Sequence, residues 1–232
     1  DVPADWVLEE LGHVASLKTG GSAPQGERYF KDGKHPFIRV QHFDGAAKYL
    51  TRWDLITDEA VKDYRLKLFK KDTILFPKSG ASIMLEKRVK LPFSAYVVSH
   101  LCCVEPDEVE NDFLFYVLKY IKFAHTTDGS TLPYLNLNHL AKRLIPVPTL
   151  PEQQCIAHVL STVQYTIEQQ DRLIKLTREL KSALMHKLFT GGLHGEKQKM
   201  TEIGPVPESW KVLPLDELLT RTQYGLSIRG ED

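Results

Sequence analysis

The chain has 232 residues, of which 42% are hydrophobic and 26% charged, a composition typical of a globular protein. Thirty Lys and Arg residues balance thirty Asp and Glu residues, so the net charge favours no particular class of partner. No run approaches the roughly 20 apolar residues of a membrane span, and the first residues do not resemble a signal peptide. We therefore expect no membrane partner.

Three cysteines are present, at positions 102, 103 and 155. They cannot all pair within one chain, and Cys102 and Cys103 are adjacent in an apolar run. We expect buried free thiols, which suit the reducing cytoplasm.

The beginning of the chain is repeated near its end. At a constant offset of 204 residues, Val2, Pro3, Trp6, Leu11 and Gly21 match Val206, Pro207, Trp210, Leu215 and Gly225. Such internal repetition predicts that residues 205–232 are the truncated start of a second copy of one unit.

Between these ends the pattern predicts an α+β domain over residues 1–150, with a small mixed or antiparallel sheet. Short apolar runs bounded by turn residues predict strands at 36–40, 73–76, 95–98 and 101–104. A helix near 59–64 would be capped by Thr57 or Asp58, and a second would be capped by Asn111 or Asp112.

A single long helix is predicted over residues 151–190, followed by a linker at 191–204. Pro151 fits the first helical turn, and Gly191 and Gly192 end the helix. At 1.5 Å rise per residue the helix would be roughly 55–60 Å long.

One edge of this helix carries apolar residues at the spacing of a coiled coil. The edge, which we call the seam, comprises Ile156, Leu160, Val163, Ile167, Ile174, Leu180, Leu184 and Leu188. Gln170 and Thr177 interrupt it. The seam requires a second long helix, from another chain or from a part of the protein not present here, and a self-dimer is one way to supply it.

Charge is unevenly distributed along the chain. Residues 62–90 hold nine basic side chains against three acidic ones. A basic face suits a polyanion such as DNA, although such charge can also serve only to keep a surface hydrated.

Motifs for catalysis or cofactor binding are missing from the sequence. It has no phosphate-binding loop, no zinc-ligand spacing and no Asn/Asp-Pro-Pro-aromatic motif of amino-methyltransferases. His100 near Cys102 leaves a hydrolase as a third alternative, but their run has the pattern of a strand core. We expect no catalytic residue, no metal and no cofactor on this chain.

Three stretches together resemble the specificity subunit of type I restriction–modification systems. They are DTILFPKSG at 72–80, GSTLPYLN at 129–136 continuing through IPVP to LPEQQCI at 150–156, and GPVPESW at 204–210. The resemblance covers nearly the whole chain, and the order of the three stretches adds to its specificity.

This resemblance implies a non-catalytic protein that recognises double-stranded DNA. In that family each subunit holds two target recognition domains separated by two antiparallel helices, and each domain reads half of a split target. Methylation subunits, which bind S-adenosylmethionine, dock on the helices, and a restriction subunit joins for cleavage. This chain departs from the pattern, because it has one recognition domain, one helix and the start of a second domain.

Polar residues next to the predicted strands are the candidates for DNA contact. Arginine and glutamine can pair bidentately with guanine and adenine, and a turn with small and basic residues suits a phosphate. The candidates are Lys18, Arg39, Gln41, His42, Lys78, Ser79, Lys87, Arg88, Thr131, Tyr134 and Asn136. The alternative function is an assembly module whose helix gathers partners and whose globular domain does not touch DNA.

Overall fold

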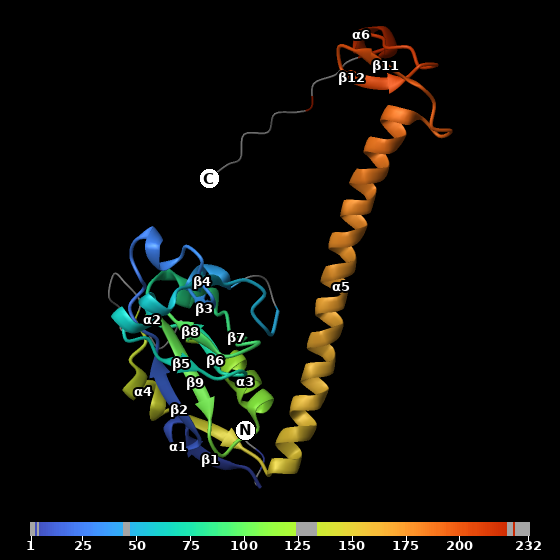
Figure 1. Ribbon diagram of the computed structural model, residues 1–232. Coiled ribbons are helices and arrows are strands. Elements are labelled where there is room, and N and C mark those ends of the chain that lie inside the picture. The colour runs from blue at the N-terminus through green and yellow to red at the C-terminus, as the bar shows by residue number, and fades with distance from the viewer. Residues whose placement is uncertain (1–2, 4, 44–46, 124–133, 222–224, 226–232) are drawn as a thin grey trace. The chain divides into compact units, whose positions relative to one another are not determined.

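The computed structural model describes residues 3, 5–43, 47–123, 134–221 and 225. The chain forms two compact units, Asp1–Gln169 and Gln170–Asp232. We call the part of the first unit that precedes the long helix the head (Figure 1). The predicted division at residues 150, 190 and 204 follows sequence features rather than contacts, and it stays a prediction.

The described residues of the head form ten short strands and four short α-helices, as expected for an α+β fold. The strands are β1 (Val7–Glu10), β2 (Ala15–Thr19), β3 (His35–Ile38), β4 (Asp54–Ile56), β5 (Leu68–Phe69), β6 (Ile74–Pro77), β7 (Val89–Lys90), β8 (Ala95–Val97), β9 (Leu101–Pro106) and β10 (Leu144–Val147). The helices are α1 (Leu11–Val14), α2 (Asp58–Asp63), α3 (Asn111–Tyr120) and α4 (Leu137–Ala141), with 3₁₀ turns η1 (Glu27–Tyr29), η2 (Val40–His42) and η3 (Ala81–Leu85).

Two four-stranded sheets form the body of the head. The first is antiparallel, in the order β2-β9-β6-β7, and the second is mixed, in the order β4-β3-β8-β5 with β3 and β8 parallel. A separate antiparallel pair joins β1 to β10, so that the start of the head lies beside the strand that leads into the long helix. The predicted mixed or antiparallel sheet is therefore confirmed, as two sheets.

The first sheet is buried on both faces. Successive strand side chains point to opposite faces, so Ile74 and Phe76 pack against α1, α3 and α4, while Leu75 packs toward the second sheet. Cys102 and Cys103 on β9 divide in the same way. This three-layer packing explains why these strands read as continuous apolar runs in the sequence.

Two details of the predicted elements differ from the structure. The strand predicted at 36–40 ends at Ile38, because the chain turns into η2. Thr57 caps α2 as expected, but the cap of α3 is Glu110, whose carboxylate accepts from the backbone N–H of Phe113, and not Asn111 or Asp112.

The long helix α5 is continuous from Leu150 to Gly191, and its residues from Gln170 onward belong to the second unit. There a hairpin of β11 (Gln198–Thr201) and β12 (Gly204–Pro207) occupies part of the segment predicted as a linker. It is followed by α6 (Leu215–Leu218), which lies at the offset of 204 residues from α1. Both copies of the repeat thus form a short helix at the same place.

No helix in the described part of the chain is long and apolar enough to cross a membrane. Among the same residues, no group of His, Cys, Asp and Glu side chains is arranged to hold a metal ion.

Arg88 is buried in the head, where it holds the end of α3. Its guanidinium donates to the carbonyl oxygens of Leu118 and Ile121, each at 3.1 Å, and lies over the ring of Phe123. Replacing it would leave those carbonyls without these donors, and an unsatisfied buried acceptor costs about 1–3 kcal/mol.

We therefore expect Arg88→Ala to lower the free energy of unfolding of the head by about 3 kcal/mol in urea denaturation. Lys67→Ala, at an exposed position of the same unit, is the control and should change it by less than about 0.5 kcal/mol. Equal effects of the two substitutions would contradict the role of Arg88.

The cysteines give a second prediction. Cys102 and Cys103 are buried as expected, but Cys155 is exposed on α5, which corrects the expectation of three buried thiols. Burial raises the pKa of the Cys102 thiol to about 12, and that of Cys103 is also raised by burial, so both stay protonated at pH 8.

Iodoacetamide at pH 8 should modify Cys155 alone in the native chain. In urea it should modify Cys102 and Cys103 as well, as counted by mass spectrometry. Modification of Cys102 in the native chain at the rate of Cys155 would contradict this.

Candidate nucleic-acid interface

Polar side chains from three separate segments meet where β6 ends. Ser79 Oγ lies 2.9 Å from Nδ1 of His100, and the Lys78 ammonium lies 5.2 Å from the centre of the Tyr134 ring. We call Lys78, Ser79, His100 and Tyr134 the β6-end cluster. It places a partly exposed cation and hydroxyl beside an exposed imidazole and phenol on one edge of the head.

Backbone hydrogen bonds hold the segments of the β6-end cluster together. The N–H of Lys78 donates to the carbonyl of His100 at 3.0 Å, and the N–H of Leu135 donates to the carbonyl of Lys78 at 2.8 Å. Ser79 and Tyr134 also form an isolated antiparallel bridge. The side chains are therefore placed by the β6 and β9 strands and by the segment before α4.

The glycine loop after β2 runs beside the same edge. The N–H of Gly21 donates to the carbonyl of Val97 at 2.8 Å, and Gly21 pairs with Val98. A Cβ atom at Gly20 would lie 2.0 Å from that carbonyl oxygen, which is far inside contact distance. Glycine is therefore required at position 20 for the loop to approach the β8–β9 turn.

Arg39, which is partly exposed, and His42, which is buried, are brought together by Asp54. Arg39 Nε lies 2.9 Å and His42 Nε2 lies 3.4 Å from the Asp54 carboxylate, and the guanidinium lies over the ring of Phe30. Burial lowers the pKa of His42 despite the nearby Asp54. Its Nδ1 accepts from the backbone N–H of Arg39, so the neutral ring carries its proton on Nε2 toward Asp54.

Gln41 lies between these two residues in sequence but has an exposed side chain. The η2 turn directs it outward while it turns His42 into the core. Of the three residues predicted at the end of this strand, Gln41 is thus the most exposed, Arg39 is partly exposed and His42 is buried.

The other predicted residues lie in several places. Lys87 donates to the carbonyl of Phe43 at 2.8 Å, Lys18 on β2 pairs with Glu105 on β9, and Asn136 accepts from the N–H of Asn138 as the cap of α4. Arg88 faces the core, so a DNA contact would require it to leave the α3 carbonyls. Thr131 lies outside the described residues. Which of these residues contact DNA stays a prediction.

His100 was not among the predicted DNA contacts. Its run has the pattern of a strand core, whereas the chain turns at Ser99 and His100 between β8 and β9. The signal was present in the sequence, because two polar residues separate the apolar runs 95–98 and 101–104.

The structure does not support a cysteine hydrolase. The Cys102 thiol is fully buried, and its raised pKa of about 12 leaves almost no thiolate at neutral pH. The His100 ring contacts the hydroxyl of Ser79 through Nδ1.

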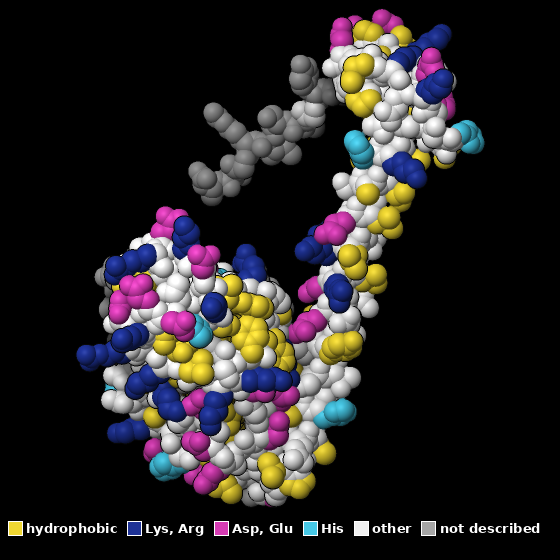
Figure 2. Space-filling view, in the orientation of Figure 1, with side chains coloured by type: hydrophobic (Ala, Val, Ile, Leu, Met, Phe, Trp, Pro, Cys, Tyr) yellow, Lys and Arg dark blue, Asp and Glu magenta, His cyan; other side chains and the backbone are white. Residues whose placement is uncertain are grey.

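The α5 helix packs on the head with one face and exposes another. The residues that face the head within the first unit recur at helical spacing: Gln153, Ala157, Ser161, Gln164 and Glu168. We call them the inner stripe. The seam residues of the same turns remain exposed, with Leu160 at 39% and Val163 at 54%, and Figure 2 shows yellow side chains along the helix. Pairing of the seam with another helix stays a prediction.

Comparison with known proteins gives a family match. The family model described as "Type I restriction modification DNA specificity domain" matches residues 3–178. The specificity subunit of type I restriction enzyme MjaIX from Methanocaldococcus jannaschii is 30% identical over 85% of this chain and 46% of its own length. The chain spans about half the length of the curated relatives that it matches.

Solved structures share the fold. A chain from a type I restriction–modification assembly is 24% identical, with a TM-score of 0.60 over 83% of this chain and 48% of that one. The specificity subunit from M. genitalium is 20% identical, with a TM-score of 0.59 over 82% of this chain and 47% of that one. The fold and the family model agree, and the chain belongs to the family of type I restriction–modification DNA specificity domains.

Proposed function

We propose that this chain recognises one half of a bipartite DNA target within a type I restriction–modification complex. The observation that carries this proposal is the β6-end cluster, a group of exposed and partly exposed DNA-compatible side chains fixed by the sheet. Lysine and hydroxyl groups suit phosphates, and polar side chains on a rigid body can reach base edges. Gln41, exposed on the η2 turn, is the second candidate reader.

The helix supplies the second part of the proposal. With its inner stripe bound to the head, α5 keeps the seam available for a partner helix and for methylation subunits. The chain itself carries no chemistry: S-adenosylmethionine and adenine methylation belong to the methylation subunits, and cleavage belongs to the restriction subunit. Such a complex would work on cytoplasmic DNA.

The test is reconstitution with the cognate methylation subunit, followed by sequencing of methylated adenines in genomic DNA. A recurring motif with one half read by this head supports the proposal. An assembly module that does not touch DNA would instead leave the motif unchanged when Gln41 and Lys78 are both replaced by alanine.

Lys78 gives a quantitative form of this test. Lys78→Ala should weaken DNA binding by the reconstituted complex and reduce the slope of log affinity against log salt by about one, because one phosphate contact is lost. Lys62→Ala, an exposed lysine on α2, should leave both quantities unchanged. An unchanged salt slope for Lys78→Ala, measured by fluorescence anisotropy, would remove Lys78 from the interface.

The seam gives a prediction of a different kind. Leu160 is partly exposed in the single chain, so Leu160→Glu should leave the head folded but place a charge in any helix pair that buries it. Sedimentation and co-purification with the methylation subunit should then show loss of association. Gln169→Glu adds the same charge on another exposed face of α5 and should associate as the unchanged chain does. Retained association of Leu160→Glu would show that the seam is not the contact.

A further inference from the structure

A network of charged and polar groups connects the head to the first half of α5. The Lys48 ammonium lies 2.7 Å from the Asp112 carboxylate and donates to Ser161 Oγ at 3.0 Å. The backbone N–H of Lys48 donates to the Glu168 carboxylate at 2.7 Å. We call Lys48, Asp112, Ser161 and Glu168 the joint. It takes two residues from the head and two from the inner stripe.

The joint is closed to solvent at its centre. Lys48 is 8% exposed and Lys90, which also pairs with Asp112, is 2% exposed. Burial alone would raise the pKa of Asp112, but hydrogen bonds from Lys48 and Lys90 hold the pKa below its ordinary value. The carboxylate therefore stays ionised between two buried ammonium groups, and separating them is costly because a buried charge would lose its partner.

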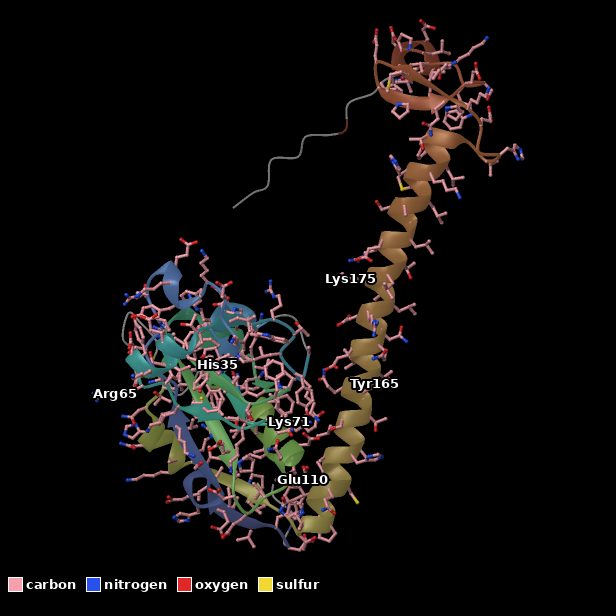
Figure 3. The ribbon with its side chains drawn as sticks, viewed as in Figure 1. His35, Arg65, Lys71, Glu110, Tyr165 and Lys175 are labelled. Atoms are coloured by element: carbon pink, nitrogen blue, oxygen red, sulfur yellow. The ribbon has the colours of Figure 1, made fainter. Side chains whose placement is uncertain are left out.

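Further hydrogen bonds extend the contact along the inner stripe. Lys119 of α3 donates to Gln164 at 3.0 Å, and the Tyr116 hydroxyl donates to Ser161 at 3.3 Å. Nearer the start of α5, the backbone N–H of Glu110, labelled in Figure 3, donates to Gln153 at 2.8 Å. Hydrogen bonds tolerate little change in angle, whereas apolar surfaces can slide. A helix attached through such contacts has one preferred orientation on the head.

The joint also connects α5 to strand β7 of the head. Lys48 follows η2 by a few residues, and its carbonyl accepts from the N–H of Lys90 at 2.7 Å. Lys48 is thus fastened to β7 through its backbone carbonyl and to α5 through its backbone N–H. Movement of the helix would be transmitted to β7 through the Lys48 backbone.

We propose that Lys48, Asp112, Ser161 and Glu168 are positioning residues that fix the orientation of the head on α5, and thereby the gap that the complex accepts between the two halves of its target. The effect on the gap rests on the proposed function. The orientation itself does not, and it can be measured on the chain alone.

The first experiment measures orientation without DNA. Two exposed positions receive spin labels, Lys62→Cys on α2 and Tyr165→Cys on α5 (Tyr165 is labelled in Figure 3). The distance between the two labels reports how the head lies on the helix. The exposed Cys155 is replaced by serine so that it takes no label. Glu168→Ala removes the acceptor for the Lys48 N–H and should broaden the distance distribution at least about twofold. Glu168→Gln keeps an oxygen in that place and should restore the narrow distribution.

Glu179→Ala, an exposed carboxylate of the same helix, is the matched control and should leave the distribution narrow. Circular dichroism checks that each variant is folded. Ser161→Ala, which removes a different acceptor of the joint, provides a second broadening test if Glu168→Ala does not fold. A narrow distribution in a folded Glu168→Ala or Ser161→Ala chain would overturn the role of the joint.

The second experiment measures methylation by the reconstituted methylase on three kinds of oligonucleotide. Their half-sites are separated by the native gap, by one base pair more or by one base pair less. Glu168→Ala should reduce the preference for the native gap at least about fivefold while the bases read in each half-site stay the same. An unchanged gap preference, or altered half-site bases, would overturn the proposal. If the unmodified complex methylates DNA without sequence preference, the proposed function fails, and the distance measurement still decides whether the joint fixes orientation.

Discussion

The Asp112 carboxylate and the two buried lysines around it connect parts of the head that are distant in sequence. Lys90 belongs to β7, Lys48 to the segment after η2, and Asp112 to the first turn of α3. Each charge is satisfied only while the others stay in place, since an unpaired buried charge is expensive. Three segments are therefore held in one arrangement, and α5 is attached to that arrangement through Ser161 and Glu168.

This attachment divides the surface of α5 between two tasks. The inner stripe is polar or small, so the head binds the helix without using its apolar residues. The seam lies on another side of the same turns and remains exposed. Had the helix packed on its own head through the seam, no apolar edge would remain for a partner helix. The polar attachment thus makes an intermolecular or interdomain use of the seam compatible with a folded head.

Sequence reasoning recovered what depends on local pattern and missed what depends on tertiary contact. The long helix, the seam and the strands around Leu75 and Cys102 follow from periodicity and apolar runs, and the structure has them. The inner stripe was not predicted, because periodicity was sought in apolar residues, and Gln164 and Glu168 resemble a solvated face. The partners of Arg39, His42 and Arg88, which are Asp54 and the α3 carbonyls, come from remote segments that one sequence does not place, and the DNA contacts predicted for these residues stay predictions.

In the two copies of the repeat, the motif determines the secondary structure, while other segments determine how deeply its side chains are buried. Leu11 and Leu215 occupy the same position in two copies of one motif, each at the first residue of a short helix. Leu11 is 0% exposed because α4 and β10 complete its surroundings, whereas Leu215 is 68% exposed in its own unit. The motif therefore specifies its helix locally, whereas its burial depends on other segments of the head, the segment at 137–147 among them. The tryptophans of the motif also have different surroundings in the two copies. Trp6 donates to Glu152 near the paired strands β1 and β10, whereas Trp210 packs edge-on against Phe189 in the second unit. A repeated sequence thus acquires a different environment in each unit because its burial is supplied by residues outside the repeat motif itself.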